Sequence, residues 1–206
     1  MADFPTRDPA SPEFWNERFA AGFTPWDQGG VPRALQRFVE SRQFRKRRVL
    51  IPGCGSAYEA GWLDALGFDV VAIDYAQAAI ERARSILPPP VAQRVLRHAD
   101  FFAFAAEPFD WIYERAFLPA LPPALWPRWA ARLPTLLLPD GELGGLFFID
   151  TELPQPRRGP PFVTTRAEVD ALLGVAFDCL EDVPIPPADS LPVFAGRERW
   201  MRWRRK

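Results

Sequence analysis

Three neighbouring segments of the chain carry residue types that could bind a nucleotide-like ligand. In VLIPGCGSAYEAG, Gly53 and Gly55 form a turn between an apolar run and a helical pattern. Asp74 ends the next apolar run, DVVAID, and Asp100 and Phe101 follow the third one in HADFF. Glycines let the backbone approach a ligand closely, and a carboxylate after the second strand can accept hydrogen bonds from ribose hydroxyls. With an acid and an aromatic ring available for adenine, the three segments together favour an adenosyl ligand.

The third glycine of a dinucleotide fingerprint is missing. The full pattern is G-x-G-x-x-G, and Tyr58 stands where the last glycine would fall. This argues against a pyrophosphate, which needs close approach to the helix N-terminus. It favours S-adenosylmethionine, which carries adenine and ribose without phosphate. Two alternatives stay open: the glycines could form a tight turn without a ligand, and Asp74 could cap the helix that follows it.

Chemistry at this site must proceed with little help from imidazole, because His98 is the only histidine. A Ser-His-Asp triad and a zinc site both lack their residues, so we predict no metal. Cys54, in the glycine turn, suits a small apolar packing role better than that of a nucleophile. Methyl transfer from a sulfonium fits such a chain, because the protein need only align the reactants and exclude water. Such positioning contributes roughly 7–11 kcal/mol at best.

Alternating strands and helices must position these residues. The patterns predict strands at 49–51, 69–74, 95–98, 109–113, 141–149, 177–185 and 197–203, and helices at 12–21, 33–41, 56–66, 76–86, 124–132 and 166–174. Such alternation predicts an α/β fold, with a mostly parallel sheet and helices on both faces. The last two strands could pair as an antiparallel ending. The prolines after the fourth helix are read as a helix stop.

Composition limits the class of protein. The 206 residues predict one domain, and a net charge of -1 gives no general attraction to nucleic acid or anionic membranes. We expect no membrane span and no signal peptide, because no apolar run is long enough and the N-terminus lacks the basic-then-apolar plan. Two cysteines are too few for a disulfide framework and suit a reducing cytoplasm.

Longer stretches of the sequence resemble a known family. In chain order they are FWNERFAAGFTPWDQGGVP, RVLIPGCGSAYEAGWLDALGFDVVAIDYAQAAIERA, HADFF, FDWIYERAFLPALPP, LLLPDGELGGLFF and GPPF. They resemble the thiopurine S-methyltransferase family, which includes plant-type thiol and halide methyltransferases, from about residue 13 to 177. TPWDQG, PGCG and GPPF are the most specific. The resemblance implies a seven-stranded, Rossmann-like class I methyltransferase fold as a single domain of residues 1–206. It also implies an N-terminal lid at 1–47 and a monomer.

The resemblance also implies roles for individual residues. Carried over by position, the lid over the cofactor contains Trp15, Phe19 and Trp26, and the remaining cofactor contacts are Gly53, Gly55, Asp74, Asp100, Phe101 and Arg115. The two aromatic residues of the first helix could instead be its buried face. Tryptophan faces attract cations such as a sulfonium by about 0.5–2 kcal/mol.

Arg115 is the expected catalytic residue, between cofactor and acceptor. A permanent cation there could hold an anionic acceptor, favour its thiolate form or contact the methionine carboxylate. The alternative is a salt bridge to Glu114 or Asp110. The pair Glu114-Arg115 is closer to the thiopurine-type pattern than to the plant thiol and halide enzymes.

Aromatic walls suit a soft methyl acceptor. Trp26, Phe117 and Phe162 are the candidates, although each could also pack in the core. The predicted function is methyl transfer to a small soft nucleophile: a thiol, a thiopurine, a selenium or tellurium species or a halide. An oxygen or nitrogen acceptor would need a base, for which Glu114 and Tyr113 are unconvincing. An NAD-type oxidoreductase and a non-catalytic adenosyl-binding protein are the remaining alternatives.

Overall fold

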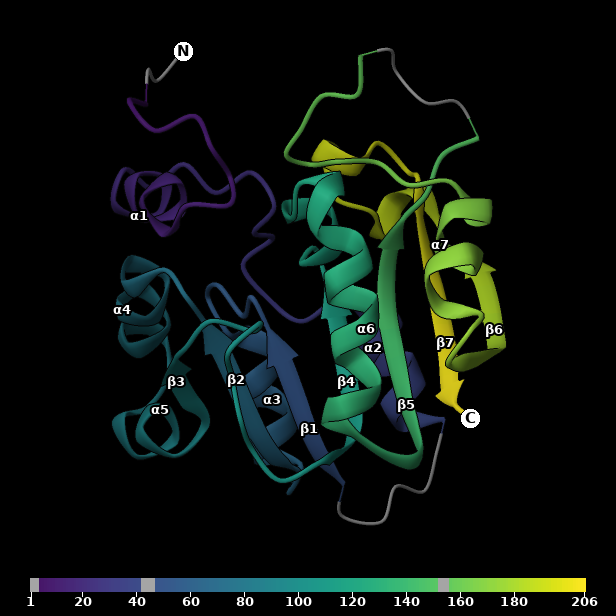
Figure 1. Ribbon diagram of the computed structural model, residues 1–206. Coiled ribbons are helices and arrows are strands. Elements are labelled where there is room, and N and C mark those ends of the chain that lie inside the picture. Colours follow the sequence, from purple (N-terminus) through teal and green to yellow (C-terminus); the bar gives the residue numbers. More distant parts are fainter. Residues whose placement is uncertain (1–3, 42–46, 152–155) are drawn as a thin grey trace.

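A seven-stranded sheet forms the centre of the molecule, with strand order β3-β2-β1-β4-β5-β7-β6 (Figure 1). The computed structural model describes residues 4–41, 47–151 and 156–206. The strands are β1 (Arg48–Pro52), β2 (Asp69–Asp74), β3 (Leu96–His98), β4 (Phe109–Arg115), β5 (Leu137–Phe148), β6 (Phe177–Pro184) and β7 (Glu198–Arg205). The pairs among β1 to β5 are parallel, and β7 runs antiparallel to both β5 and β6. The predicted mostly parallel sheet with an antiparallel C-terminal ending is therefore confirmed.

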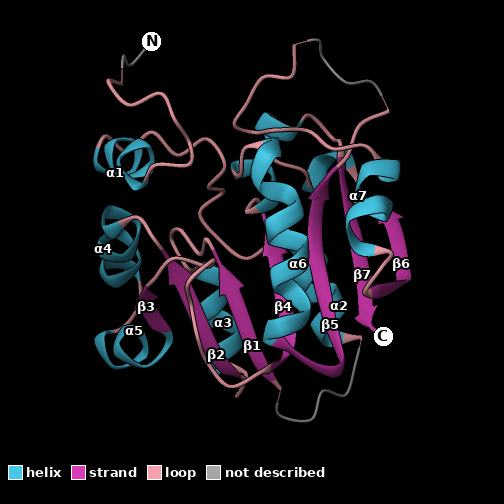
Figure 2. Ribbon diagram, viewed as in Figure 1, coloured by secondary structure: helices cyan, strands magenta, loops and turns pink. Residues whose placement is uncertain are grey.

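Helices cover both faces of this sheet (Figure 2). They are α1 (Pro12–Ala20), α2 (Arg33–Glu40), α3 (Tyr58–Ala65), α4 (Gln77–Ile86), α5 (Pro89–Val95), α6 (Trp126–Leu136) and α7 (Arg166–Leu173), with short 3-10 turns η1 (Leu118–Ala120), η2 (Pro123–Leu125), η3 (Pro187–Asp189) and η4 (Pro192–Phe194). Helices α2 to α5 belong to one apolar cluster, and α6 and α7 belong to a second. Among the described helices, none combines the length and apolar character that a membrane crossing requires.

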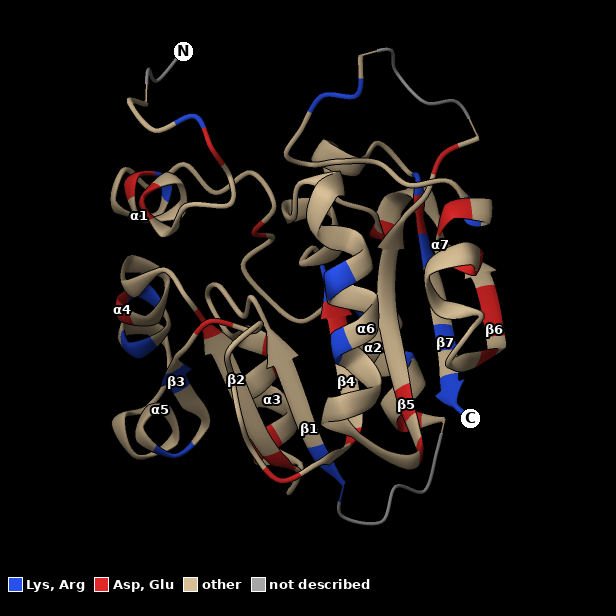
Figure 3. Ribbon diagram, in the orientation of Figure 1, with Lys and Arg blue, Asp and Glu red and all other residues tan. Residues whose placement is uncertain are grey.

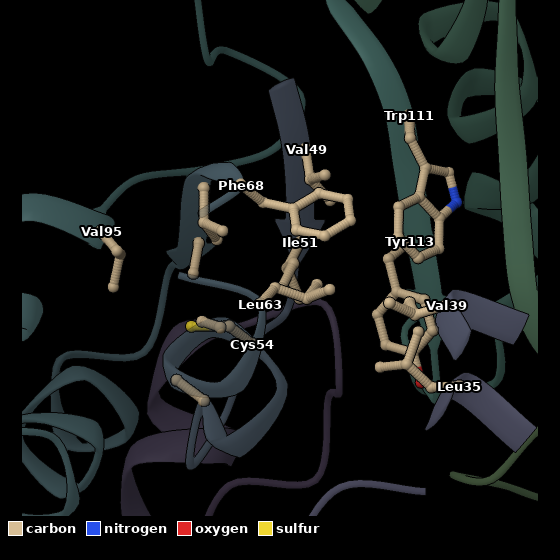
Figure 4. Packing of buried hydrophobic residues seen from close by; sticks show 14 of the residues in the cluster. Leu35, Val39, Val49, Ile51, Cys54, Leu63, Phe68, Val95, Trp111 and Tyr113 are labelled. Carbon is tan, nitrogen blue, oxygen red and sulfur yellow. The ribbon is translucent and has the colours of Figure 1, made fainter. Parts of the chain in front are cut away.

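Successive side chains along a strand belong alternately to the two apolar clusters. Val49 and Ile51 of β1 face the cluster of α2 and α3, whereas Leu50 between them faces the cluster of α6. This follows from the pleat, which sends successive side chains to opposite faces. Figure 4 shows the first cluster, with the ring of Tyr113 directed toward Leu35 of α2. Burial on both faces fixes the register of the strands and hence the position of the loops at their carboxyl ends.

One missed helix and two shifted boundaries are the main differences from the sequence prediction. The triple-proline stretch ends α4, as expected, but it also begins α5, which the sequence analysis missed. Proline is favoured in the first turn of a helix, where its missing N–H has no intrahelical partner. Helix α6 continues past the predicted end at 132 and contains Pro134, and β5 begins at Leu137 rather than at 141.

Ion pairs join the last strands of the sheet. Arg199 of β7 pairs with Asp182 of β6 at 2.5 Å, and Arg202 pairs with Glu142 of β5 at 2.9 Å and with Glu181 of β6 at 3.1 Å. Figure 3 shows acidic residues on β6 beside basic residues on β7. These pairs hold β7 in place between its two neighbours, and β7 begins with a residue of the site described below.

The N-terminal segment packs over one end of the sheet. Helix α1 begins at a capping serine, whose hydroxyl accepts a hydrogen bond from Glu13 N, and has proline in its first turn. Its Trp15 and Phe19 pack against Ala76 and Ala79 at the start of α4. Within the predicted lid of residues 1–47, residues 1–3 and 42–46 lie outside the described part of the chain.

Candidate active site

The glycine turn follows β1 and requires glycine at its first position. Gly53 has a φ of +60° and Gly55 a φ of +51°, in the left-handed region that side chains disfavour. A Cβ atom on Gly53 would lie 2.5 Å from Cδ2 of Phe117, whereas one on Gly55 would meet Phe19 at 3.5 Å, an ordinary contact. The backbone of Gly53 is therefore in direct contact with an aromatic ring that also lines the cleft.

Asp74 ends β2 and holds this turn. Its Oδ2 accepts a hydrogen bond from Gly55 N at 3.1 Å, and its Oδ1 accepts one from Ala76 N at 2.9 Å. The second bond forms a local turn and does not cap α4, whose N-cap residue is Ala76 itself. Burial raises the pKa of Asp74 to about 6, and the backbone donors partly offset that effect. Each carboxylate oxygen keeps a lone pair for a further donor.

Two cavities meet above these residues. One has a volume of about 490 Å³ and the other of about 590 Å³. Both are lined by Gly53, Asp74, Tyr75, Phe117 and Leu121. They lie at the carboxyl edge of the parallel strands, where open α/β sheets bind their ligands. Because they share these five residues, we treat them as the two parts of one cleft.

Aromatic residues of the N-terminal segment form a wall of the first cavity. Trp15, Phe19 and Trp26 all line it. The Trp26 ring lies edge-on to both others, with centroid distances of 5.4 Å to Trp15 and 5.8 Å to Phe19. Trp15 and Phe19 thus lie on the buried face of α1 and also line the cleft. The two interpretations of the sequence, helix packing and cleft wall, are therefore compatible.

The loop that carries Trp26 is tied to the glycine turn and to α4. Oδ2 of Asp27 accepts hydrogen bonds from Ser56 Oγ at 2.5 Å and from Arg82 Nη2 at 3.1 Å. Nε of Arg82 also donates to Ser56 Oγ at 2.7 Å. This three-residue network, the Asp27–Ser56–Arg82 network, fixes the predicted lid segment against the turn.

The second cavity contains the acid and aromatic that follow β3. Asp100 lines it, and its Oδ1 accepts a hydrogen bond from Phe102 N at 2.9 Å. Phe101 is almost fully buried and lies edge-on to Phe117, 5.1 Å between centroids. The ends of β1, β2 and β3 are thus brought together as the sequence predicted.

Arg115 lines the first cavity at the end of β4, and its partners differ from the predicted alternatives. Its Nη1 donates to Glu198 Oε1 of β7 at 2.9 Å, and its Nη2 donates to Gln28 Oε1 of the lid segment at 3.2 Å. The predicted partners Glu114 and Asp110 make neither bond. Glu198 is itself buried and accepts a hydrogen bond from Ser190. Arg115 therefore joins the lid segment to the C-terminal strand.

Glu114 supports the turn beneath Arg115. Its Oε1 accepts hydrogen bonds from the backbone N–H groups of Phe117 and Leu118, both at 2.9 Å. Burial raises its pKa to about 7. Its side chain lines neither of the two cavities, so its contact is with the chain that carries Phe117 rather than with the cleft.

The two phenylalanines expected at the acceptor have different places. Phe117 lines both cavities. Phe162 lines neither of them: its ring packs beneath Gly159, where a Cβ would approach it to 2.5 Å, and its backbone N–H donates to Pro119 O. The cleft is lined instead by the preceding residues of the GPPF loop, Gly159, Pro160 and Pro161.

Other residues of the cleft were missed from the sequence. Glu59 lines the first cavity from the first turn of α3, and its position directly after the glycine turn was an available signal. Val193 and Phe194 reach the same cavity from η4. Their loop shows no pattern that would place it there. Burial raises the pKa of Cys54 well above its ordinary value, with help from Asp74 and Glu59, so its thiol stays protonated.

Comparison with known sequences identifies relatives along almost the whole chain. The model of the thiopurine S-methyltransferase (TPMT) family matches residues 10–206. A probable thiol methyltransferase 2 from Arabidopsis thaliana is 32% identical over 196 residues, which cover 93% of this chain and 84% of that protein. A thiopurine S-methyltransferase from Pseudomonas fluorescens is 32% identical over 181 residues, which cover 80% of this chain and 82% of that protein.

Solved structures share the fold. A 1,6-didemethyltoxoflavin-N1-methyltransferase from Burkholderia thailandensis superposes with a TM-score of 0.75 at 19% identity, covering 100% of this chain and 93% of its own. A TehB-like SAM-dependent methyltransferase from Corynebacterium glutamicum has a TM-score of 0.65 at 16% identity, with 97% and 100% covered. The predicted class I methyltransferase fold is confirmed. With the match over residues 10–206, these findings show that the chain belongs to the thiopurine S-methyltransferase family of S-adenosylmethionine-dependent methyltransferases.

Proposed function

We propose that this chain transfers a methyl group from S-adenosyl-L-methionine to a small soft nucleophile, with a thiol as the first acceptor to test. The observation that carries the proposal is the two-part cleft. One part contains the ends of β2 and β3, and the other is lined by aromatic rings and by Arg115. The acceptors left open by the sequence, namely thiopurines, selenium or tellurium species and halides, belong to the same class of soft nucleophiles.

The residues present fit the cofactor. A side chain at Gly53 would fill the turn, so the glycine keeps the backbone accessible to a ligand. Asp74 has lone pairs available for ribose hydroxyls, and Asp100 and Phe101 line the adjoining cavity where adenine would lie. When bound, the cofactor supplies a methyl group on a sulfonium, which is a strong electrophile with a neutral leaving group.

The walls of the first cavity suit the acceptor. Trp26 and Phe117 offer polarizable faces, and Pro160 and Pro161 line the same cavity. The hydrogen bonds of Arg115 to Glu198 and Gln28 leave donors of its guanidinium fork for an anionic sulfur or for a carboxylate. Phe162 supports the proline loop from behind. In this arrangement the protein orients the acceptor and excludes water, which is the main requirement of an in-line displacement.

The test is methyl transfer by the purified protein from S-adenosylmethionine to a set of acceptors, followed by mass spectrometry of the products. We expect methylated 2-mercaptoethanol and thiophenol, and no methylated catechol or alkylamine. Asp74→Asn is the control, because it should lose cofactor binding. Transfer only to the oxygen or nitrogen acceptors would contradict the proposal. It would support the alternative of a methyltransferase for small oxygen or nitrogen acceptors.

We also propose that residues 1–206 form one domain, with 1–47 as its lid, and that the protein acts as a cytoplasmic monomer without nucleic-acid partners. Cys54 and Cys179 remain free thiols, which suits a reducing compartment. The net charge of -1 gives no electrostatic reason to bind nucleic acid. Light scattering coupled to size exclusion tests the monomer, since a mass of twice 23.3 kDa would contradict it.

A further inference from the structure

Glu59 is a buried acid in the cleft that the proposed function does not yet use. It is the second residue of α3, directly after the glycine turn, and its exposed fraction is 9%. It lines the first cavity together with Arg115 and the lid aromatics. Burial of a carboxyl group is unfavourable unless the group has a partner. At such a place the partner is either a ligand in the cleft or another group of the protein.

The other acids of this cavity have structural partners. Asp74 accepts hydrogen bonds from two backbone N–H groups, and Asp27 accepts them from Ser56 and Arg82. No neighbouring side chain within the described ranges donates a hydrogen bond to the carboxylate of Glu59. Of the three acids that line the cavity, Glu59 is the one whose carboxylate accepts no hydrogen bond from another described residue; its own backbone N–H is its donor, and lone pairs remain for a ligand.

The groups around Glu59 set its titration. Burial raises its pKa, the charge of Arg115 at the end of β4 lowers it, and Asp27 of the lid segment raises it. Tyr113 of β4 and Cys54 of the turn both respond to the charge of Glu59, and burial raises the pKa of each well above its ordinary value. These two neighbours therefore stay protonated while Glu59 titrates.

We propose that Glu59 accepts the proton of an uncharged thiol as its sulfur attacks the methyl group, an assignment that rests on the proposed function. The S–H bond breaks and the proton passes to a Glu59 carboxylate oxygen. The sulfur electron pair forms the new bond to the methyl carbon, while the bond from that carbon to the sulfonium sulfur breaks and leaves its electrons on the donor. The products are a thioether, S-adenosylhomocysteine and a proton that Glu59 returns to solvent.

The kinetic test compares Glu59→Gln with the wild type on two acceptors. 2-Mercaptoethanol carries its proton at neutral pH, whereas 4-nitrothiophenol is already ionised. We expect kcat/KM at pH 7 to fall about 100-fold or more for 2-mercaptoethanol, the usual contribution of a positioned base, and not to fall for 4-nitrothiophenol, whose anionic sulfur is then no longer opposed by the Glu59 charge. The loss should shrink as the pH rises and free thiolate becomes available. Equal losses on both acceptors, or no loss on either, would overturn the assignment.

A binding measurement tests the same proton without turnover. Seating an anionic sulfur beside Glu59 raises its pKa, so 4-nitrothiophenolate should bind the complex with S-adenosylhomocysteine with uptake of up to one proton. Calorimetry in two buffers of different ionisation enthalpy measures this uptake. It should vanish in Glu59→Gln and persist in the control Glu81→Gln, an exposed acid of α4. The same uptake in wild type and Glu59→Gln would overturn the assignment.

Failure of the proposed function and failure of the Glu59 assignment alone can be distinguished. If the wild type methylates neither thiol, the proposed function fails and the catalytic assignment fails with it, while loss of proton uptake in Glu59→Gln would show only that Glu59 takes up a proton beside a bound thiolate. Thermal unfolding and affinity for S-adenosylhomocysteine check that the variant is folded. Glutamine keeps the shape of the side chain and removes a buried charge, so both properties should be retained.

Discussion

The ring of Phe117 lies on the backbone of Gly53, so close that a Cβ atom at position 53 would be 2.5 Å from ring Cδ2. This contact joins the turn after β1 to the turn after β4. It places an aromatic face, which lines both cavities, directly beside the exposed backbone of the glycine turn.

Gly53→Ala should therefore disturb both stability and ligand binding. The left-handed φ costs about 1–2 kcal/mol in the free energy of unfolding, and Phe117 must also move out of the cleft wall. Gly67→Ala is the matched control, because Gly67 has a φ of +85° but no heavy atom within 4 Å of its Cβ position. Calorimetry should show loss of S-adenosylhomocysteine affinity only in Gly53→Ala. Equal affinity in both variants would argue against a ligand at this turn.

Cofactor affinity should depend on pH through Asp74. Its pKa is raised to about 6 in the protein without ligand, and ribose hydroxyls that donate to the carboxylate favour its charged form. Affinity for S-adenosylhomocysteine should thus rise with pH up to about 6 and then level off. Below that value the loss approaches about tenfold per pH unit.

Asp74→Asn should remove this dependence and weaken binding at neutral pH. The measurement is a calorimetric titration with S-adenosylhomocysteine at several values between pH 5 and 8. An affinity that is independent of pH in the wild type would show that Asp74 does not bind the ribose as a carboxylate.

The Asp27–Ser56–Arg82 network should contribute to cofactor affinity more than to stability. Asp27→Asn weakens the ion pair that holds the loop of Trp26 against α4, and partly exposed pairs contribute about 0.2–1 kcal/mol to folding. Asp64→Asn is the control, because Asp64 pairs with Arg94 away from the cleft. We expect weaker S-adenosylhomocysteine binding only in Asp27→Asn, with small changes in Tm for both. Unchanged affinity of Asp27→Asn for S-adenosylhomocysteine would show that the network does not hold the lid segment in its binding position.

Glu114 should make the protein less stable as the pH rises. Its pKa is raised to about 7 in the fold and is near 4.5 in the unfolded chain. Between these values the folded state binds the extra proton, so the free energy of unfolding falls with rising pH, by about 3 kcal/mol at most. Above pH 7 the full penalty remains.

Glu114→Gln should remove this penalty, because it keeps an acceptor for the N–H groups of Phe117 and Leu118 without the charge. Denaturant unfolding should show the variant more stable than the wild type at pH 8, with the difference shrinking toward pH 5. A constant difference across this range would contradict the raised pKa.

The parts of the site nearest the sheet edge could be predicted from the sequence. Gly53 directly follows β1, Asp74 ends β2 and Asp100 comes two residues after β3, and the carboxyl ends of neighbouring parallel strands meet in space. Such positions need only the local pattern and the topology. The mostly parallel sheet followed from the alternation of strands and helices, whereas the order of its strands was not predicted.

Other features depend on tertiary contacts that no local pattern encodes. The ion pair of Arg115 joins residues 83 positions apart, so the sequence offered its near neighbours instead of Glu198. Helix α5 was missed because prolines that end one helix also begin the next. Which residues of a loop face the cleft depends on the packing beneath the loop. Pro160 and Pro161 line the cleft, whereas the ring of Phe162 packs against Gly159.

The two parts of the cleft differ in how freely they can evolve. The part around Gly53 and Asp74 is built on the strand ends, where a change of residue disturbs the sheet itself. The proposed acceptor walls come from loops, the prolines at 160–161 and the η4 residues 193–194. Mutations in those loops can reshape the acceptor pocket and leave the donor side intact. Related proteins with this fold can thus differ in their methyl acceptor while they keep the same methyl donor.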